Sequence, residues 1–287
     1  MFDINRKLYP FESKYLLLGD ETKLHYVDEG EGPVILMLHG NPTWSFLYRN
    51  MIKELSSDFR CVAPDLSGFG KSEPAKGFDF RAASHAELII EFVNHLQLKD
   101  VILICQDWGG PIGLNLAISN PANIKGMVLG NTWGWPLKGS LRFELFSRLN
   151  GGFIGRSMAY AFNGVWRLFM RAGFYHKVPK EVLNMYAAPF KKRSRRKQTS
   201  VFPRELIKAY DFENRIINNF KTIEHIPVLF LWGTKDFAFK TGALKRFQKL
   251  FVNHQTHPLQ AGHFWQEDAW LEASQWFRKW YKEHQMT

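Results

Sequence analysis

The stretch Ile102-Leu-Ile-Cys-Gln-Asp-Trp-Gly-Gly-Pro-Ile-Gly-Leu114 joins an apolar run to two glycines and then to a second apolar segment. The first run is typical of a buried strand, and the residues after Gly110 are typical of a helix. A strand, an abrupt turn and a helix form the context of a nucleophile elbow, in which small residues lie two positions before and after the nucleophile. Here Cys105 and Gly109 take those positions, and Asp107 stands at the apex.

Asp107 allows two interpretations. A carboxylate is ionised at neutral pH, and the positive end of the following helix stabilises its charge. It matches peptide or ester carbonyls poorly, but it is a workable nucleophile at a saturated carbon with a leaving group, where it forms an alkyl-enzyme ester. Alternatively, Asp107 is only the N-cap of the helix, a position that Asp favours. The stretch alone leaves both interpretations open.

The chain has 287 residues, which suits one large domain or a core domain with an inserted lid. Hydrophobic residues make up 45% and charged residues 23%, as in an ordinary globular protein. There is no apolar run of the roughly 18 residues that a membrane span requires, and no apolar segment of a secretory signal. The two cysteines, Cys61 and Cys105, lie in strand-like runs. We therefore predict buried free thiols and a cytoplasmic protein.

The formal net charge is +11, and one basic cluster, residues 191–197, stands out. Such a cluster can bind nucleic acid or an anionic surface. It has no interleaved aromatic residues and no nucleic-acid-binding motif. We interpret it as a solvated, charged helix face, and we expect no nucleic-acid and no membrane partner.

Apolar strand-like runs alternate with helical patterns along most of the chain, which predicts a mostly parallel eight-stranded sheet with helices on both faces. The expected strands are residues 14–18, 23–27, 34–38, 59–63, 101–105, 124–130, 228–232 and 256–259. The first two are joined by a turn sequence and predict a hairpin. Residues 135–215 lose this alternation and contain short amphipathic helices. We therefore predict a core of residues 1–134 and 216–287 with an inserted helical cap at 135–215.

Polar residues collect where these strands end. His39-Gly-Asn41, Asp107-Trp108, Asp236 and His263 each follow an apolar run, and the carboxyl ends of parallel strands are where such sheets bind ligands. Taken singly, Asp236 could be a turn or helix cap and His263 an exposed loop residue. Their joint occurrence in the order nucleophile, acid, histidine favours a catalytic site. The Gly and Pro that flank Asn41 predict a fixed turn with a cis Asn41–Pro42 bond.

Three segments carry a resemblance to a known family: His39-Gly-Asn-Pro-Thr-Trp-Ser45, Gln106-Asp-Trp-Gly-Gly110 and Gly262-His-Phe-Trp-Gln-Glu267. In them the chain resembles haloalkane dehalogenases of the α/β-hydrolase fold, and the similarity covers nearly its whole length. The Asp-Trp pair combined with Asn after His-Gly is specific. Related epoxide hydrolases and fluoroacetate dehalogenases usually have an aromatic residue at the position of Asn41.

The resemblance implies a role for each residue. Asp107 attacks the halogen-bearing carbon, and the Trp108 indole and the Asn41 side-chain amide hold the halide. His263 then activates water to hydrolyse the ester, Asp236 orients the imidazole, and the main-chain amides of Asn41 and Trp108 form the oxyanion hole. The implied partners are a small halogenated hydrocarbon, water and the released chloride or bromide. The resemblance implies no cofactor and no metal.

The position of the triad acid separates subfamilies. Some members carry it as a Glu after the strand that follows the elbow helix, but here Asn131 stands there, and Glu144 lies in the cap. With the acid at Asp236, the chain resembles the subfamily usually numbered third. Another subfamily holds the halide with a cap tryptophan, which Trp166 could supply. Because Asn41 is present, we interpret Trp166 as a packing residue.

The cap is expected to set the size of the substrate. Candidate pocket residues are Trp133, Trp135, Phe143, Phe162, Trp166, Phe169 and Phe264. The leading hypothesis is hydrolysis of small haloalkanes. Epoxide hydrolysis uses the same Asp and His but requires proton donors for the epoxide oxygen, which Tyr160, Tyr175 or Tyr186 of the cap could provide. A luciferase-like oxygenase, or a ligand-binding protein on the same scaffold, is the second alternative.

Overall fold

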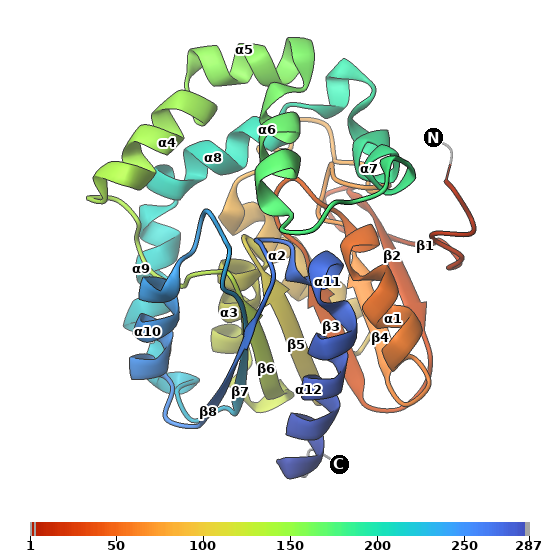
Figure 1. The fold of residues 1–287 in the computed structure, drawn as a ribbon, viewed down its shortest axis with the longest axis vertical. Helices are drawn as coiled ribbons and strands as arrows, with labels where there is room; N and C mark the ends of the chain where they lie inside the picture. The colour runs from red at the N-terminus through yellow and green to blue at the C-terminus, as the bar shows by residue number, and fades with distance from the viewer. Residues whose placement is uncertain (1, 3, 285–287) are drawn as a thin grey trace.

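The apolar runs build one open, twisted sheet, drawn in Figure 1 from a computed structural model that describes residues 2 and 4–284. Within that part of the chain the sheet has eight strands. In sheet order they are β1 (Lys14–Leu17), β2 (Lys23–Glu29), β4 (Arg60–Pro64), β3 (Val34–Leu38), β5 (Val101–Gln106), β6 (Ile124–Gly130), β7 (Val228–Gly233) and β8 (His254–Leu259). β1 and β2 form the predicted hairpin, β2 is antiparallel to β4, and every later pair is parallel. The predicted fold class is confirmed.

Helices fall into two groups by their position in the chain. Those that surround the sheet are α1 (Arg49–Leu55), α2 (Ala82–His95), α3 (Gly109–Ser119), α9 (Tyr210–Asn218), α10 (Thr241–Leu250), α11 (Trp265–Asp268) and α12 (Trp270–Glu283). Those between β6 and α9, which we call the cap helices, are α4 (Leu141–Gly151), α5 (Phe153–Phe162), α6 (Gly164–Gly173), α7 (Lys180–Ala187) and α8 (Gln198–Lys208). Single 3-10 turns occur at Ser45–Tyr48, Pro121–Asn123, Ala188–Phe190, Arg193–Arg195 and Phe220–Thr222.

Side-chain alternation along the buried strands produces two separate cores. In β5, Leu103 packs in one hydrophobic cluster and Ile102 and Ile104 in the other, because successive strand residues point to opposite faces. The first cluster includes residues of α2, α3, α9 and α10, and the second includes residues of α1 and α12. Both faces of the parallel sheet are therefore covered, which explains why its strands read as continuous apolar runs.

The cap helices lie together over the edge of the sheet where the parallel strands end (Figure 1). They occupy the chain segment in which the sequence predicts a cap. The predicted boundary at residue 215 falls inside α9, whose buried residues Phe212 and Ile216 belong to the core cluster beside α2 and α3. α9 therefore packs against α3 of the core as well as against the cap helix α8.

The basic segment 191–197 differs from the solvated helix face that we predicted. It forms a 3-10 turn, and two of its arginines anchor the chain. Arg195 donates to the carbonyl oxygens of Gly70 and Ser72 at 3.0 and 2.8 Å, and Arg196 donates to that of Phe190 at 2.7 Å. A planar guanidinium carries several N–H donors, so it can form hydrogen bonds to several neighbouring main-chain carbonyl oxygens that have no partner within a helix.

The elbow has an unusual backbone. Asp107 has φ of +51°, a left-handed conformation that non-glycine residues rarely adopt. Its main chain is held by N–H donation to the carbonyl of Asn131 at 3.2 Å and by the Thr132 hydroxyl, which donates to the Asp107 carbonyl at 2.6 Å. A Cβ atom at Gly109 would overlap the carbonyl oxygen of Leu38, so α3 can start this close to β3 only with glycine. The predicted cis Asn41–Pro42 bond and the two buried free cysteines are confirmed.

Gly109→Ala should therefore destabilise the protein by about 2–3 kcal/mol, because main-chain atoms cannot yield as a flexible side chain can. Gly242→Ala is the matched control, since a Cβ there meets open space at the start of α10. Urea unfolding followed by tryptophan fluorescence measures both variants. Equal stability of the two variants would show that the approach of α3 to β3 is not tight.

Candidate active site

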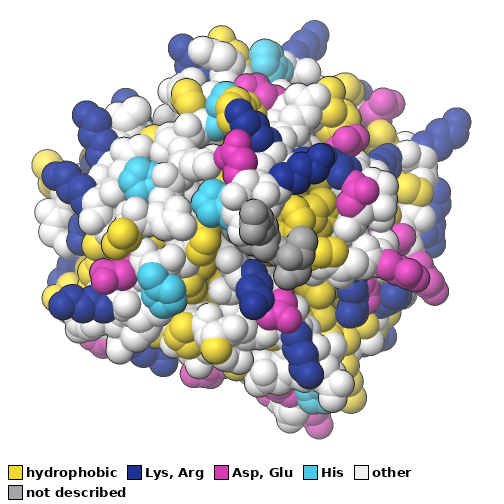
Figure 2. Space-filling model, turned by 90° about the horizontal axis from the view of Figure 1, so that it is seen from below, with side chains coloured by type: hydrophobic (Ala, Val, Ile, Leu, Met, Phe, Trp, Pro, Cys, Tyr) yellow, Lys and Arg dark blue, Asp and Glu magenta, His cyan; other side chains and the backbone are white. Residues whose placement is uncertain are grey.

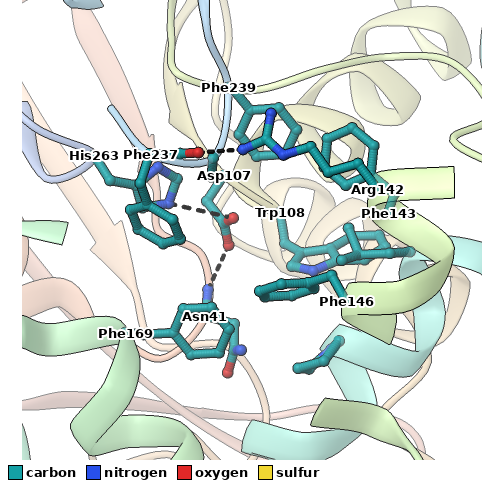
Figure 3. A pocket seen from close by; sticks show the side chains of 13 residues that line it. Asn41, Asp107, Trp108, Arg142, Phe143, Phe146, Phe169, Phe237, Phe239 and His263 are labelled. Carbon is teal, nitrogen blue, oxygen red and sulfur yellow. Dashed lines mark hydrogen bonds and ion pairs between the residues drawn. The ribbon is translucent and has the colours of Figure 1, made fainter. Parts of the chain in front are cut away.

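Asp107 projects from the elbow into a site built by strand ends, as Figure 3 shows. Its Oδ1 accepts the main-chain N–H of Asn41 at 2.7 Å, and its Oδ2 lies 3.4 Å from Nε2 of His263. The N-cap residue of α3 is Trp108, not Asp107. The carboxylate thus faces the loop after β3 and the histidine, which argues against a role limited to helix capping.

His263 and Asp236 form a buried pair. Nδ1 of His263 lies 3.0 Å from Oδ2 of Asp236, and the two residues are 3% and 5% exposed. Each follows one of the neighbouring strands β7 and β8, so the parallel order of the sheet brings them together. His263 is therefore not an exposed loop residue.

Asp236 is satisfied by main-chain and side-chain donors. It accepts N–H groups of Ala238 at 2.6 Å and Phe239 at 3.1 Å, so it forms a turn as well as holding the histidine. The third donor is Nδ2 of Asn131 at 2.9 Å. Asn131, which directly follows β6, therefore helps to hold the Asp236 side chain in place. Three donors therefore fix the position of the Asp236 carboxylate.

Gln106, which the sequence analysis did not single out, favours one tautomer of the His263 ring when that ring is neutral. Its Nε2 donates to the main-chain carbonyl of His263 at 3.1 Å and lies 2.9 Å from the imidazole Nε2. A carbonyl oxygen only accepts, so the first contact identifies the amide nitrogen. An N–H group then faces the imidazole Nε2, which favours a lone pair there and the proton on Nδ1 toward Asp236.

The carboxylates of Asp236 and Asp107 oppose the effect of Gln106, because they favour the protonated form of His263. Burial lowers the pKa of His263, but Asp236 and Asp107 together outweigh it and raise the pKa to about 10. The influence of Asp107 depends on its charge. If Asp107 becomes an ester, one carboxylate no longer acts on His263, and the Gln106 N–H group then favours the neutral imidazole, which is a base.

His39 shapes the loop after β3 without reaching the cavity. Its Nε2 accepts the N–H of Leu66 at 2.9 Å, so Nδ1 carries the proton and donates to the Gly40 carbonyl at 2.9 Å. Burial lowers the pKa of His39, which suits this neutral form. Gly40 is required beside it, because a Cβ there would overlap the Asp107 carboxylate.

A cavity opens next to the Asp107 carboxylate, between the strand ends and the cap helices (Figure 3). It is lined by Asn41, Asp107, Trp108 and His263, and by Arg142, Phe143, Phe146, Phe169, Pro203, Leu206, Phe237, Ala238 and Phe239. The wall is mostly apolar and aromatic, and the polar groups converge on its floor. Such a cavity is typical of a site for a small apolar ligand.

Of the seven predicted pocket residues, Phe143 and Phe169 line this cavity, and the other five lie outside it. Trp133 is buried behind Trp108, with ring centroids 4.7 Å apart. Trp135 packs edge-on against Phe247 in the same hydrophobic cluster. Each is an aromatic residue that fills the core instead of the cavity.

The remaining three also lie outside the cavity lining. Phe162 is 69% exposed, and with Trp166 it borders a separate surface hollow. This position supports packing, and not halide binding, for Trp166. Phe264 packs against His263 and Phe174 in the core cluster beside α12.

The cavity residues that the sequence analysis missed fall into two kinds. Phe146 follows Phe143 by three positions, so it shares a face of α4, and helical spacing could have found it. Phe237 and Phe239 follow Asp236 in an irregular loop, where no periodicity indicates the direction of a side chain.

Comparison with known proteins agrees with this geometry. The family model of the alpha/beta hydrolase fold matches residues 33–269. Haloalkane dehalogenase 2 of Mycobacterium tuberculosis strain H37Rv is 39% identical over 271 residues, which cover 93% of this chain and 94% of that protein. The chain belongs to the haloalkane dehalogenase family of the α/β-hydrolase fold.

Two further relatives frame this family membership. The crystal structure of the haloalkane dehalogenase DbeA from Bradyrhizobium elkani superposes with a TM-score of 0.86 at 24% identity, covering 96% of this chain and 99% of that one. This likeness concerns the fold. A cis-3-alkyl-4-alkyloxetan-2-one decarboxylase of Shewanella oneidensis is 29% identical, covering 91% of this chain and 86% of that protein. The scaffold therefore also carries a differently named activity.

In this dehalogenase-family chain, a buried acid supports the tryptophan of the cavity floor. Glu213 of α9 accepts the indole N–H of Trp133 at 2.8 Å, and Trp133 packs edge-on against Trp108. Burial raises the pKa of Glu213 to about 8, against a smaller opposing effect of the Trp133 hydrogen bond. Glu213 thus keeps its proton at neutral pH and helps to hold Trp133 in place behind Trp108.

Removing the charge of Asp107 should lower the pKa of His263. In Asp107→Asn we expect that pKa to fall by at least about one pH unit, because one of the two carboxylates that raise it is lost. NMR titration with labelled histidine measures the change, and Asp211→Asn, an exposed acid of α9, is the control. An unchanged pKa in Asp107→Asn would show that the two groups are uncoupled.

Glu213→Gln should remove a pH dependence of stability. Folded Glu213 holds its proton up to about pH 8, whereas the unfolded side chain loses it near its ordinary pKa of 4.5. The free energy of unfolding of the wild type should therefore fall relative to Glu213→Gln as pH rises between those values. Urea unfolding at several pH values measures this, with exposed Glu87→Gln as the control. Parallel pH curves for the wild type and Glu213→Gln would contradict the assignment.

Proposed function

We propose that this chain hydrolyses small haloalkanes to an alcohol and a halide through a covalent ester of Asp107. The observation that carries the proposal is the position of the Asp107 carboxylate. It lies on the cavity floor, with Oδ1 on the Asn41 amide and Oδ2 3.4 Å from His263. A carboxylate placed so at the end of an apolar cavity suits attack on a saturated carbon.

In the first step, an oxygen of Asp107 forms a bond to the halogen-bearing carbon as the carbon–halogen bond breaks. The electron pair of that bond leaves with the halide. We assign the Trp108 indole N–H and the Asn41 side-chain amide to the halide. Nδ2 of Asn41 makes only a long 3.4 Å contact to the Thr199 carbonyl, so turning it toward an anion costs little. Neutral donors stabilise the developing charge without preventing release.

In the second step, Nε2 of His263 takes a proton from water, and the water oxygen attacks the ester carbonyl carbon of Asp107. The Asn41 main-chain amide, which now contacts Oδ1, stabilises the tetrahedral oxyanion together with the Trp108 amide. The bond between the carbonyl carbon and the ester oxygen that carries the alkyl group then breaks. The alcohol leaves with a proton from His263. Asp236 holds the imidazole and stabilises its cation.

The position of the acid supports assignment to the third subfamily. Asp236 is hydrogen-bonded to His263, and Asn131 donates a hydrogen bond to Asp236. The acid after β7 therefore fills the role that a Glu after β6 has in another subfamily. We further propose that residues 135–215 act as a cap that limits substrate size. The aromatic residues Phe143, Phe146 and Phe169 of the cap helices form one wall of the cavity.

Epoxide hydrolysis is less well supported, because it needs a proton donor near the leaving oxygen. The three cap tyrosines do not supply one among the described lining residues. Tyr160 and Tyr175 are 54% and 48% exposed, and the buried Tyr186 donates its hydroxyl proton to Glu267 at 2.7 Å.

Halide release by the wild type and by His263→Phe tests the mechanism. With 1-bromobutane or 1,2-dibromoethane, the wild type should release bromide steadily. His263→Phe should release one equivalent, gain the mass of the alkyl group and then turn over about 10²–10⁴-fold more slowly, because its ester persists. His225→Phe, which changes an exposed histidine, should behave like the wild type.

Other outcomes of this experiment would change the assignment. Steady release by His263→Phe at the wild-type rate would mean that His263 is not the base. No bromide from the wild type, with styrene oxide opened, would favour an epoxide hydrolase. No reaction in either assay would contradict both and favour the luciferase-like or ligand-binding alternative, or a reaction like that of the decarboxylase relative.

A further inference from the structure

The net positive charge of this chain comes from one segment. Residues 141–197 contain 13 of the 38 Lys and Arg residues but only 2 of the 27 Asp and Glu residues. The rest of the chain therefore has 25 residues of each sign, and all of the formal net charge of +11 lies in the segment that holds α4 to α7 and the basic turn before α8. A field of one sign on one side attracts an anionic partner.

Exposed apolar side chains gather in the same segment. Of 14 large hydrophobic residues exposed among the described residues, ten lie between residues 141 and 175. They are Leu141, Leu145, Leu149, Phe153, Ile154, Met158, Tyr160, Phe162, Leu168 and Tyr175. Several are largely in solvent, with Leu141 at 82% and Phe153 at 79%. Scattered exposed leucines need no explanation, but a concentration of this kind marks an interaction surface.

α5 shows how the two features arise together. Its small residues Gly155 and Ala159 face the protein, while Phe153, Ile154 and Met158 face solvent with Arg156 beside them. A surface helix normally turns its large apolar residues inward. Here the orientation is reversed, on a helix that lies at the end of the molecule farthest from the strands' amino ends (Figure 1).

The opposite end of the molecule looks different. Figure 2 views that end, and there Lys and Arg side chains are mixed with Asp and Glu side chains. This mixture agrees with the balanced charge of the chain outside residues 141–197. The net positive charge is therefore a property of the cap side and not of the whole surface.

A hollow between α5 and α8 adds a place for anionic groups. Its lining includes the cations Arg81, Arg156, Lys197, Arg204 and Lys208, with Asp79 and Glu205 as the acids. The hollow borders α5, which carries exposed apolar residues. Cations next to exposed hydrophobic side chains match the phosphate layer and the acyl-chain boundary of a membrane surface.

We propose that the outer surface of α4, α5 and α6, with the exposed basic residues 191–193, docks on an anionic phospholipid membrane. The docking is peripheral, since no helix in the described part of the chain has the length and hydropathy to cross a bilayer. We expected no membrane partner when net charge was the only indication. The exposed apolar side chains are a second, independent observation.

Charge decides between a membrane and the other occupants of such a surface. Two copies of this chain meeting through their caps would bring together two segments of net charge +11 each, which repel. A nucleic acid would match the cations, but it has no apolar layer to receive Leu145, Phe153 or Ile154. An anionic bilayer matches both features.

Docking there would turn the cavity toward the lipid. α4 places Phe143 and Phe146 in the cavity wall and exposes Leu141, Leu145 and Leu149 on its other side. An apolar substrate dissolved in the bilayer would then reach the cavity with a short path through water. This consequence rests on the proposed function, whereas the docking surface itself does not.

Vesicle flotation with the whole protein tests the docking without any turnover. Neutral phosphatidylcholine vesicles are compared with vesicles containing about 30% phosphatidylglycerol, at low salt and at about 0.5 M NaCl. We expect the wild type to float with the anionic vesicles only, and salt to weaken the binding. No binding to the anionic vesicles overturns the proposal.

Two sets of variants separate the charge from the apolar contribution. Lys191→Gln/Lys192→Gln/Arg193→Gln and Phe153→Ser/Ile154→Ser should each lower the partition coefficient at least about tenfold. The controls remove the same charge or similar apolar area elsewhere. They are Lys221→Gln/Lys245→Gln/Lys249→Gln and Leu17→Ser/Val252→Ser, all at exposed positions. Equal losses in the cap variants and their controls would overturn the assignment of the surface.

Light scattering and duplex-DNA binding complete the test. Concentration-dependent dimerisation that Phe153→Ser/Ile154→Ser abolishes, without vesicle binding, would show that a second copy covers this surface. DNA binding without vesicle binding would show a nucleic-acid surface instead. Either result overturns the proposal, and neither bears on dehalogenation, which the bromide assay measures separately.

Discussion

The left-handed backbone of Asp107 is the constraint on which the site depends. A non-glycine residue at φ of +51° costs roughly 1–3 kcal/mol, so its surroundings must enforce it. Thr132 and Asn131 hold the Asp107 main chain from the β6 side, and Gly109 lets α3 begin against the carbonyl of Leu38. As a result, the Asp107 carboxylate points away from the edge of the sheet and lies between the loop after β3 and the histidine after β8.

Around that carboxylate, the ionisable groups are coupled so that one chemical event changes another. With Asp107 charged, two carboxylates raise the pKa of His263. The Gln106 N–H group, 2.9 Å from Nε2, opposes this. In the mechanism that we propose, esterification of Asp107 would remove one of the two carboxylate charges, and the neutral imidazole would then be favoured as the base that activates water. A histidine with one carboxylate partner would lack this dependence on the state of the nucleophile.

The sequence predicts the parts of the site that lie on regular structure. Asp107, Asp236 and His263 each follow an apolar run, and parallel strands bring such positions to one edge. Gln106 was missed because it ends a buried run in which a polar residue gives no sign of its direction. Phe237 and Phe239 lie in a loop without periodicity, so only the fold shows that they reach the cavity.

The cap was harder to interpret for a physical reason. Prediction assigns large apolar residues to the inside, and on that rule Phe162 was expected in the pocket, although it is 69% exposed. α4 breaks the same rule, with phenylalanines toward the cavity and leucines toward solvent. A helix that is apolar on two sides does not reveal in its sequence which side faces the cavity. On the outside of a molecule, one apolar side of such a helix stays exposed to solvent. The thirteen cations of residues 141–197 favour an anionic surface as the partner that buries it.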